Sequence, residues 1–279
     1  MSRVSVITGG AGGMGLATAR VVGRDHALVL CDVRRERLDS AVAALTAEGV
    51  AVTGIDCDVT DEPAVTAMFD TAAGLGTIAS VIHTAGVSPS MGAADYVMKT
   101  NAIGTVNVNE AFHRVAADAA AIVNVASMAA HMLPDEIVPT ERFPLALTDP
   151  DQFMAEMTAT CSMAPEEARS GFAYAVSKSF VKWYSSSQAE RFNGRGIRIV
   201  SVSPGSIDTE MGRLEEQAGA GALVADAAVP RWGRPEEMAE LLAFCAGDKA
   251  GYLTGTDILN DGGVIASIRE RARRAAATA

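Results

Sequence analysis

A tyrosine and a lysine, Tyr174 and Lys178, stand four residues apart near the start of a long segment with helical spacing. Four residues make about one helical turn, so the two side chains share one face. A neighbouring ammonium group stabilises a phenolate and lowers the pKa of a tyrosine, which suits Tyr174 to general acid–base chemistry. Ser127 ends the run Asn124-Val-Ala-Ser127, where its hydroxyl could hydrogen-bond a reacting oxygen. Taken alone, such a tyrosine–lysine pair is mostly structural, and such a serine is usually a cap.

A glycine-rich run at residues 8–15 lies between the first expected strand and the first expected helix. Glycine lets a pyrophosphate approach the main chain, and the N-terminus of a helix offers free N–H groups to phosphates. Either glycine pattern alone is weak, but its position predicts a dinucleotide site. The run fits GxGxxG through Gly10, Gly12 and Gly15, and TGxxxGxG through Gly9, Gly13 and Gly15.

Asp32 ends the second expected strand, 23 residues after Gly9. A carboxylate at this place can accept hydrogen bonds from the adenosine ribose and would repel a 2′-phosphate. The alternative is that Asp32 only caps the helix that follows. Arg34 and Arg35 could attract a phosphate, but the position of Asp32 at the strand end favours NAD over NADP.

Short runs rich in valine and isoleucine alternate with longer segments of helical spacing, such as residues 35–48, 172–192 and 235–245. This order implies right-handed crossovers and a parallel sheet covered on both faces. We therefore expect one doubly wound α/β domain of the Rossmann type over residues 1–279. Its expected strands, about seven, are residues 4–8, 27–32, 51–56, 80–84, 121–126, 197–203 and 257–260.

Two segments interrupt the alternation. Residues 128–171 are rich in proline, methionine and acidic residues, and we expect them to form a long loop inserted before the catalytic helix. A loop of this length is usually functional, so a pocket for a bulky apolar substrate and an oligomer contact both remain open. Residues 209–231, rich in glycine and alanine, are expected to form a substrate flap.

The composition excludes several classes of protein. The net charge is −11 and the only basic cluster is short, from Arg269 to Arg274, so a nucleic-acid partner is not expected. The four cysteines are widely spaced, which suggests buried thiols in a reducing compartment and no metal site. No leader peptide and no apolar stretch of membrane-spanning length is recognisable. We expect a soluble, cytoplasmic protein without a membrane partner.

Taken together, these motifs and their order resemble the short-chain dehydrogenase/reductase family over nearly the whole chain. The glycine-rich run, Ser127 and the tyrosine–lysine pair are joined by further matching segments. These are Asp58-Val59, His83-Thr-Ala-Gly86, Asn101, Ser203-Pro-Gly205, Thr209, Gly233-Arg-Pro-Glu236, Leu253-Thr-Gly255 and Asp261-Gly-Gly263.

The resemblance implies a role for each matching residue. Tyr174 would be the general acid/base, Lys178 would lower its pKa and bind the nicotinamide ribose, Ser127 would hold the substrate oxygen, and Asn101 would anchor a water in the proton relay. The residues expected to bind the cofactor are Gly9, Gly12, Gly13, Met14, Gly15, Asp32, Val33, Asp58, Val59, Ala85, Gly86, Tyr174, Lys178, Pro204, Gly205, Ile207 and Thr209.

Three departures from the family pattern refine this picture. His83 stands where the family usually has asparagine, and we expect it to make bridging hydrogen bonds rather than to take part in catalysis. The spacing from Gly86 to Asn101 is short and that from Ser127 to Tyr174 is long. Together with Ala129-Ala-His131 and the segment 143–147, these spacings resemble the bacterial 3α-hydroxysteroid dehydrogenase/carbonyl reductase branch.

The sequence thus predicts an NAD-dependent enzyme that interconverts a secondary alcohol and a ketone, with a hydroxysteroid or another small apolar carbonyl compound as substrate. An NADP-dependent 3-oxoacyl-type or carbonyl reductase, and a non-catalytic nucleotide-binding sensor, are the alternatives. The resemblance also implies a homodimer or homotetramer. Segment 172–192 is rich in aromatic residues, and we expect this segment or its neighbour to meet a symmetry mate.

Overall fold

The computed structural model describes residues 2–278, in which seven parallel strands form a single sheet in the order β3-β2-β1-β4-β5-β6-β7. The order reverses between β1 and β4, and ligands of such sheets bind where this happens, outside the carboxyl ends of the strands. The doubly wound α/β fold predicted from the sequence is confirmed. The strands are β1 (Arg3–Thr8), β2 (Ala27–Asp32), β3 (Val52–Asp56), β4 (Thr77–His83), β5 (Ala121–Val125), β6 (Arg198–Pro204) and β7 (Asp257–Asn260).

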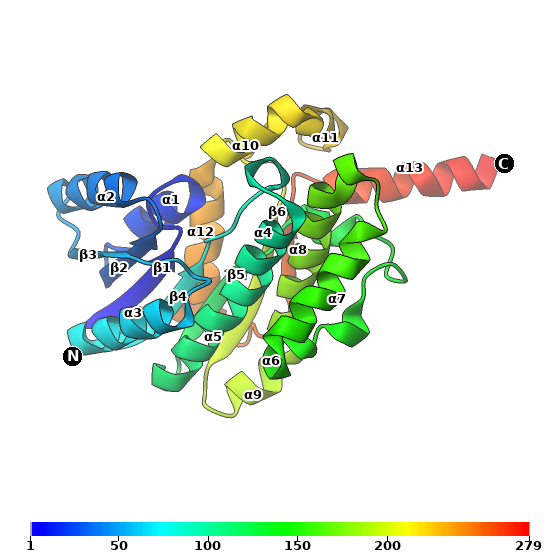
Figure 1. Ribbon diagram of the computed structural model, residues 1–279. Helices are drawn as coiled ribbons and strands as arrows, with labels where there is room; N and C mark the ends of the chain where they lie inside the picture. Colours follow the sequence, from blue (N-terminus) through cyan, green and yellow to red (C-terminus); the bar gives the residue numbers. More distant parts are fainter. Residues whose placement is uncertain (1, 279) are drawn as a thin grey trace.

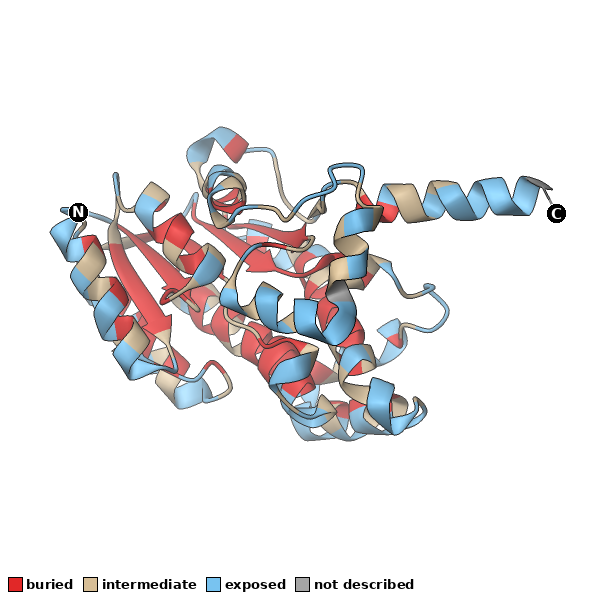
Figure 2. Cartoon of the chain, turned by 90° about the horizontal axis from the view of Figure 1, so that it is seen from above, coloured by how far each residue is buried: buried red, intermediate tan, exposed pale blue. Residues whose placement is uncertain are grey.

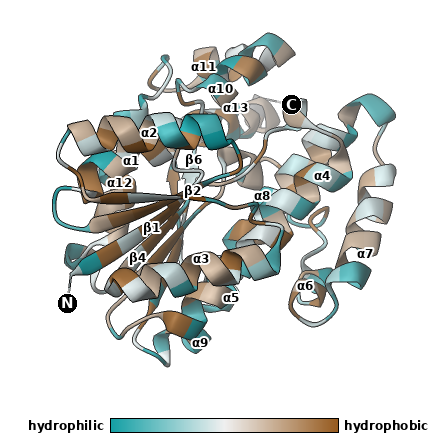
Figure 3. Cartoon of the chain, turned by 60° about the vertical axis from the view of Figure 1, so that its left-hand side comes forward, coloured by the Kyte–Doolittle hydropathy of each residue, from teal (hydrophilic) through white to brown (hydrophobic). Residues whose placement is uncertain are grey.

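Helices cover both faces of the sheet (Figure 1). On one face, α1 (Gly13–Val22), α2 (Arg35–Ala47) and α12 (Pro235–Ala246) share a core with the strands. On the other face lie α3 (Glu62–Leu75), α5 (Gly104–Val115) and α8 (Arg169–Ser187). Two buried faces explain why the central strands are continuous apolar runs rather than alternating ones. The strands are accordingly buried in Figure 2 and hydrophobic in Figure 3.

The shorter elements lie around the edges of this frame. The segment expected as one helix at 172–192 divides into α8 and α9 (Ala189–Asn193). Between β4 and α5 lie η1 (Pro89–Met91), α4 (Ala94–Met98) and the π-helical η2 (Lys99–Ile103), and η7 (Asp248–Ala250) precedes β7. In residues 2–278, no helix is both long and apolar enough to cross a bilayer.

The insertion at residues 128–171 is largely helical, not the loop that its proline content suggested. It comprises η3 (Met128–His131), η4 (Thr140–Arg142), α6 (Leu145–Thr148), α7 (Pro150–Ser162) and η5 (Glu166–Ala168). Helix α7 begins because Pro150 occupies its first turn and the Asp149 carboxylate accepts a hydrogen bond from the backbone N–H of Gln152 at 2.9 Å. Proline at this position favours the start of a helix. The prediction of a loop was wrong because it took the proline content as a sign of irregular structure.

The insertion packs on the aromatic side of α8. Phe143 and Phe153 are fully buried, and the ring centroid of each lies 5.3 Å from that of Phe180. Phe180 and Tyr184 are also fully buried. The chain itself therefore covers these α8 side chains, and they give no reason to place a symmetry mate on this helix.

The flap at residues 209–231 consists mainly of α10 (Glu210–Glu215), η6 (Glu216–Ala220) and α11 (Gly221–Asp226). Helix α11 contacts the last helix, α13 (Val264–Thr278). Helix α13 leaves the body of the molecule and projects outward (Figures 1 and 2). Its beginning is buried, with Val264 and Ile265 almost free of solvent contact.

Candidate active site

The residues expected to be catalytic come together beyond the carboxyl end of β5. Ser127 caps η3 by accepting a hydrogen bond from the backbone N–H of Ala129 at 3.1 Å. Tyr174 lies on α8, and the Ser127 hydroxyl is near enough to lower the pKa of its phenol. The two hydroxyls are thus adjacent although 47 residues separate them in the chain.

Lys178 is one turn after Tyr174 and is buried with 6% of its surface exposed. Its Nζ donates a hydrogen bond to the Val125 carbonyl oxygen at 2.9 Å and lies 5.8 Å from the centroid of the Tyr174 ring. Burial disfavours the ammonium form and lowers the pKa of Lys178 to about 8. The lysine can therefore exchange a proton at mildly alkaline pH.

The pKa of Tyr174 differs from the sequence-based expectation. Burial raises it, the hydrogen bond with Ser127 lowers it, and the charge of Glu215 raises it further, so the net direction is upward. Lys178 is not among the groups that set this pKa, so the expected lowering by the lysine is not found. Ser127 is the group that favours the phenolate in this structure.

Asn101 lies in the π-helical turn η2, and its side chain is fully engaged. Its Oδ1 accepts from the Val87 N–H at 2.9 Å, and its Nδ2 donates to the Val87 carbonyl and to Ser177 Oγ. A Cβ at Gly86 would lie 3.0 Å from Asn101 Oδ1 and 3.3 Å from Lys178 Nζ. Asn101, Gly86 and Lys178 therefore form one compact group beside Tyr174.

The glycine-rich turn has the shape that a dinucleotide requires. Gly9 and Gly13 have φ of 64° and 51°, in the left-handed region that favours glycine, and a Cβ at Gly9 would lie 2.8 Å from the backbone nitrogen of Ala85. Gly12 caps α1 without a side chain, which leaves the first N–H groups of this helix free of a side-chain cap. Met14 and Gly15 form the first turn. These residues fit the pyrophosphate of a nicotinamide dinucleotide.

Asp32 lies beside this turn. Its Oδ2 accepts from the Ala11 N–H at 3.3 Å and its Oδ1 accepts from the Arg34 N–H at 3.1 Å. The N-cap of α2 is Arg34, so Asp32 does not cap that helix. Burial raises the pKa of Asp32, against the lowering effects of the Ala11 hydrogen bond and the Arg37 charge. Val33, next to it, is exposed.

The remaining residues expected at the adenosine end lie around the ends of β3 and β4. Asp58 is exposed and accepts from the Thr60 N–H at 2.8 Å, whereas Val59 is buried. The N–H of Ala85 donates to Thr8 Oγ1 at 3.3 Å, which ties the β4 end to the glycine-rich turn. Ala85 therefore lies against the turn, and Asp58 follows the end of β3.

Four residues at or just after the end of β6 complete the expected cofactor set. Pro204 ends the strand, and the N–H of Gly205 donates to the Asn260 carbonyl at 3.0 Å. Ile207 is buried and pairs with Gly233. Thr209 caps α10, and its Cγ2 would lie 3.1 Å from a Cβ on Gly13. The start of the flap therefore touches the glycine-rich turn.

Comparison with known proteins shows the family to which this chain belongs. Residues 3–138 match the family model for short chain dehydrogenase, and residues 154–265 match the model described as Enoyl-(Acyl carrier protein) reductase. The short-chain dehydrogenase/reductase bsc3 of Alternaria brassicicola is 31% identical over 270 residues, which span 95% of this chain and 97% of that protein. The chain belongs to the short-chain dehydrogenase/reductase family. It is accordingly an oxidoreductase of the class that acts on alcohols or ketones with a nicotinamide cofactor.

Three further proteins are similar to this short-chain dehydrogenase/reductase at lower identity. The cis-4-hydroxycyclohexanecarboxylate dehydrogenase of Sinomonas cyclohexanicum is 29% identical, with 95% of this chain and 97% of that protein covered. A short-chain dehydrogenase/reductase from Serratia marcescens has the same fold, with a TM-score of 0.75, 24% identity and coverage of 94% and 98%. A short chain dehydrogenase from Burkholderia cenocepacia, solved in complex with NADP, has a TM-score of 0.74 at 24% identity, with coverage of 93% and 96%.

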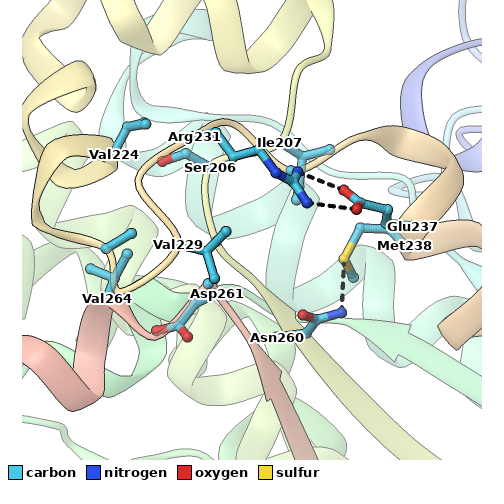
Figure 4. Close-up of a pocket in the computed structure, with 14 residues that line it drawn as sticks. Ser206, Ile207, Val224, Val229, Arg231, Glu237, Met238, Asn260, Asp261 and Val264 are labelled. Carbon is cyan, nitrogen blue, oxygen red and sulfur yellow. Dashed lines mark hydrogen bonds and ion pairs between the residues drawn. The ribbon is translucent and has the colours of Figure 1, made fainter.

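A pocket of this short-chain dehydrogenase/reductase opens between the end of the flap and the turn that follows β7 (Figure 4). Gly205 and Ile207 line it, whereas none of the four expected catalytic residues does. Arg231 and Glu237 form a two-pronged ion pair over it, at 2.8 and 2.9 Å. The pocket therefore lies beside the expected nicotinamide-side residues rather than at Ser127.

His83 has the bridging role that we expected for it. Its Nδ1 shares a hydrogen bond with Thr8 Oγ1 at 2.7 Å, and its Nε2 shares one with Thr105 Oγ1 at 3.1 Å. Burial lowers the pKa of His83 to about 3, which keeps the ring neutral. It joins β1, β4 and α5 beneath the glycine-rich turn.

Four polar residues near the site could not be identified from the sequence. Arg37 and Glu210 form an ion pair at 2.9 Å, and Nε2 of His131 lies 2.8 Å from the Asp257 carboxylate. Their separations in sequence are 173 and 126 residues, so no local spacing could join them. In the sequence, only the segment Ala129-Ala-His131 carries any signal, and that signal is a family resemblance.

Proposed function

We propose that this enzyme interconverts a secondary alcohol and a ketone, using NAD and with Tyr174 as the general acid/base. The observation that carries the proposal is the position of Ser127 beside Tyr174, near enough to lower the pKa of its phenol, one helical turn from the buried Lys178. Two adjacent hydroxyls can both hold one reacting oxygen, and a group next to that oxygen is placed to move its proton.

Each side chain then has a defined task. In oxidation, the Tyr174 phenolate removes the proton of the substrate hydroxyl while Ser127 donates a hydrogen bond to the developing carbonyl oxygen. A bound nicotinamide cofactor supplies the hydride acceptor, or the donor in reduction. Lys178, whose pKa is about 8, passes the proton from Tyr174 towards solvent, and the hydrogen-bonded Asn101 side chain holds the turn beside it. In reduction Tyr174 donates the proton instead.

The choice of NAD is supported by the carboxylate of Asp32 beside the glycine-rich turn. Such a carboxylate binds the ribose hydroxyls and repels a 2′-phosphate. NADP is the second candidate, supported by the guanidinium of Arg37, which lies against Gly12 and influences Asp32. An NADP-dependent carbonyl or 3-oxoacyl-type reductase would use that cation.

We propose an apolar, cyclic substrate such as a hydroxysteroid or a smaller ring alcohol. An apolar cluster begins one residue after Ser127, where Met128 packs with Val264 and Ile265, and Leu223 of the flap joins it. Such a wall suits an apolar ring next to the reacting oxygen. The cyclic hydroxy acid in the name of the Sinomonas relative agrees with a ring alcohol.

Two further expectations stay as proposals. We propose a homodimer or homotetramer, because closed symmetric assembly is common among such enzymes; light scattering at micromolar concentration tests it, and a monomeric mass would contradict it. We also propose a cytoplasmic location, which suits the four free, buried cysteines. Fluorescence microscopy of a tagged chain tests the location.

The decisive experiment is reduction of NAD and NADP over a panel of cyclohexanol, a 3α-hydroxysteroid and a 3-hydroxyacyl thioester. We expect turnover of a ring alcohol with NAD, and a loss of at least about 10²-fold in kcat in Tyr174→Phe. Binding of NADH, followed by its fluorescence, should not change in the variant. Cofactor binding without turnover of any compound would favour the non-catalytic sensor instead, and near-full activity of Tyr174→Phe would exclude the mechanism.

A further inference from the structure

A shielded polar cluster lies next to the catalytic groups and has no part in the proposed proton transfer. Asp257 opens β7, and 8% of its side chain is exposed. Its Oδ2 lies 2.8 Å from Nε2 of His131, and its Oδ1 accepts hydrogen bonds from Ser201 Oγ at 2.6 Å and Ser203 Oγ at 3.0 Å. His131 Nε2 also lies 3.3 Å from Ser203 Oγ. The Asp257 carboxylate thus binds three side chains, those of His131, Ser201 and Ser203.

The partners of Asp257 belong to two segments whose relative position must be fixed for the reaction. His131 ends η3, the single turn that Ser127 begins and caps. Ser201 and Ser203 belong to β6, which ends at Pro204 and leads directly into the residues expected beside the nicotinamide. The segment that holds the substrate oxygen and the strand that leads to the cofactor therefore meet at Asp257.

We propose that His131 is a positioning residue: by binding Asp257 it fixes the Ser127 turn against β6, and so aligns the substrate oxygen with the cofactor. This inference rests on the proposed function and deepens it. It assigns His131 no contact with substrate or cofactor. Its effect passes through Ser127.

The local chemistry makes this link strong. Burial raises the pKa of Asp257, but the hydrogen bonds from His131 and the two serines outweigh burial and leave the pKa below its usual value. The carboxylate is therefore ionised, and Nε2–H of His131 donates to it. Hydrogen bonds to a charged acceptor are stronger than neutral ones. Few side chains could replace the imidazole, because the donor must reach across from η3 to β7.

A second anchor shows that η3 is held from both sides. Lys182 of α8 donates from Nζ to the Ala130 carbonyl oxygen at 3.3 Å. Tyr174 is on the same helix, so the Lys182 bond fixes the position of η3 relative to the acid/base, whereas the His131 bond fixes it relative to the sheet. Ser127 must be held correctly with respect to both, because a displacement near 1 Å at a reacting centre can lower the rate by a factor on the order of 10².

The first experiment compares His131→Ala with His131→Gln in the reduction of the panel ketone, by which we mean the ketone that corresponds to the panel alcohol oxidised fastest. The carboxamide nitrogen of glutamine reaches about as far as the imidazole Nε2, so His131→Gln keeps the donor to Asp257. We expect kcat to fall about tenfold in His131→Ala, with the KM for NADH unchanged, and to recover to within about threefold in His131→Gln. His26→Ala is the matched control, since His26 also binds a serine, Ser5, at 2.6 Å. It lies away from the site and should leave kcat unchanged.

The second experiment is a double-mutant cycle with Ser127→Ala. If His131 acts through Ser127, then His131→Ala should lower kcat about tenfold in the wild type but less than about twofold in the Ser127→Ala background. Equal losses in both backgrounds would overturn the inference, as would full activity of His131→Ala. Failure of His131→Gln to recover kcat would overturn it as well, provided that its Tm matches that of His131→Ala.

The same cycle separates this inference from the proposed function. Ser127→Ala with unchanged kcat, or a wild type that reduces no panel ketone, would overturn the proposed function and the inference with it. A strong loss in Ser127→Ala together with no effect of His131→Ala would overturn the inference alone.

Discussion

Oε2 of Glu210, the first residue of α10, lies 2.9 Å from Nη1 of Arg37 on α2. The same carboxylate pairs with Arg34 at 3.5 Å, so the flap is tied to the segment that follows Asp32. The Arg37 guanidinium in turn occupies the space that a side chain at Gly12 would fill. The flap and the expected adenosine site are thus joined by an ion-pair cluster.

Cofactor preference follows from these charges. Asp32→Ala removes both the ribose acceptor and the repulsion of a 2′-phosphate, so the ratio of kcat/KM for NADPH to that for NADH should rise by about tenfold or more. Adding Arg37→Ala should abolish that gain, because Arg37 is the cation against Gly12. Initial rates with both cofactors measure the ratio. An unchanged ratio in Asp32→Ala would mean that Asp32 only shapes its turn.

Glu210→Gln tests the ion pair separately. It frees Arg37 and Arg34, and should raise kcat/KM for NADPH by no more than about fivefold, since exposed ion pairs contribute up to about 1 kcal/mol. Glu36→Gln, on an exposed part of α2, removes the same charge and is the matched control. Equal effects of the two variants would show that net charge, not the pair, is responsible.

The pH dependence of oxidation should move in opposite directions in two variants. The charge of Glu215 raises the pKa of Tyr174, and the hydrogen bond with Ser127 lowers it. Oxidation needs the phenolate, so activity rises as pH passes this pKa. Glu215→Gln should shift the rising limb of kcat for alcohol oxidation to lower pH. Ser127→Ala should shift it to higher pH as well as lowering kcat, and a common direction of shift would contradict this assignment.

The architecture, and the meeting of Ser127, Tyr174 and Lys178 at one place in the fold, could be predicted from the sequence because their signals are local. Strand runs, the glycine-rich turn and the four-residue spacing of Tyr174 and Lys178 each lie within one short segment. The direction of the Tyr174 pKa could not be predicted, since it depends on how deeply the folded chain buries both groups. The partners of His131 and Glu210 depend on tertiary contacts in the same way.

Lys178 should make the stability of the cofactor-free protein depend on pH. Burial lowers its pKa in the folded state to about 8, whereas an unfolded lysine titrates near ~10.4. Between these values the unfolded chain binds more protons, so the free energy of unfolding should rise with pH over this window. Urea unfolding at pH 7.5 and pH 10 should show a larger gain for the wild type than for Lys178→Met. A gain of the same size in both proteins would remove this assignment.

The insertion should divide into a part that supports the core and a part that meets the substrate. Phe153 is fully buried against Phe180, so Phe153→Ala should cost about 3–5 kcal/mol in free energy of unfolding while the KM for the panel ketone changes little. Met128 follows Ser127 and packs with Val264, so Met128→Ala should raise that KM for bulky ketones and leave NADH binding intact. Met163→Ala is the control, because 86% of Met163 is exposed and its loss should change stability by less than about 0.5 kcal/mol. Urea unfolding and steady-state kinetics on the three variants measure both quantities. If Phe153→Ala raised the KM as strongly as Met128→Ala does, α7 would belong to the substrate site and the division would be wrong.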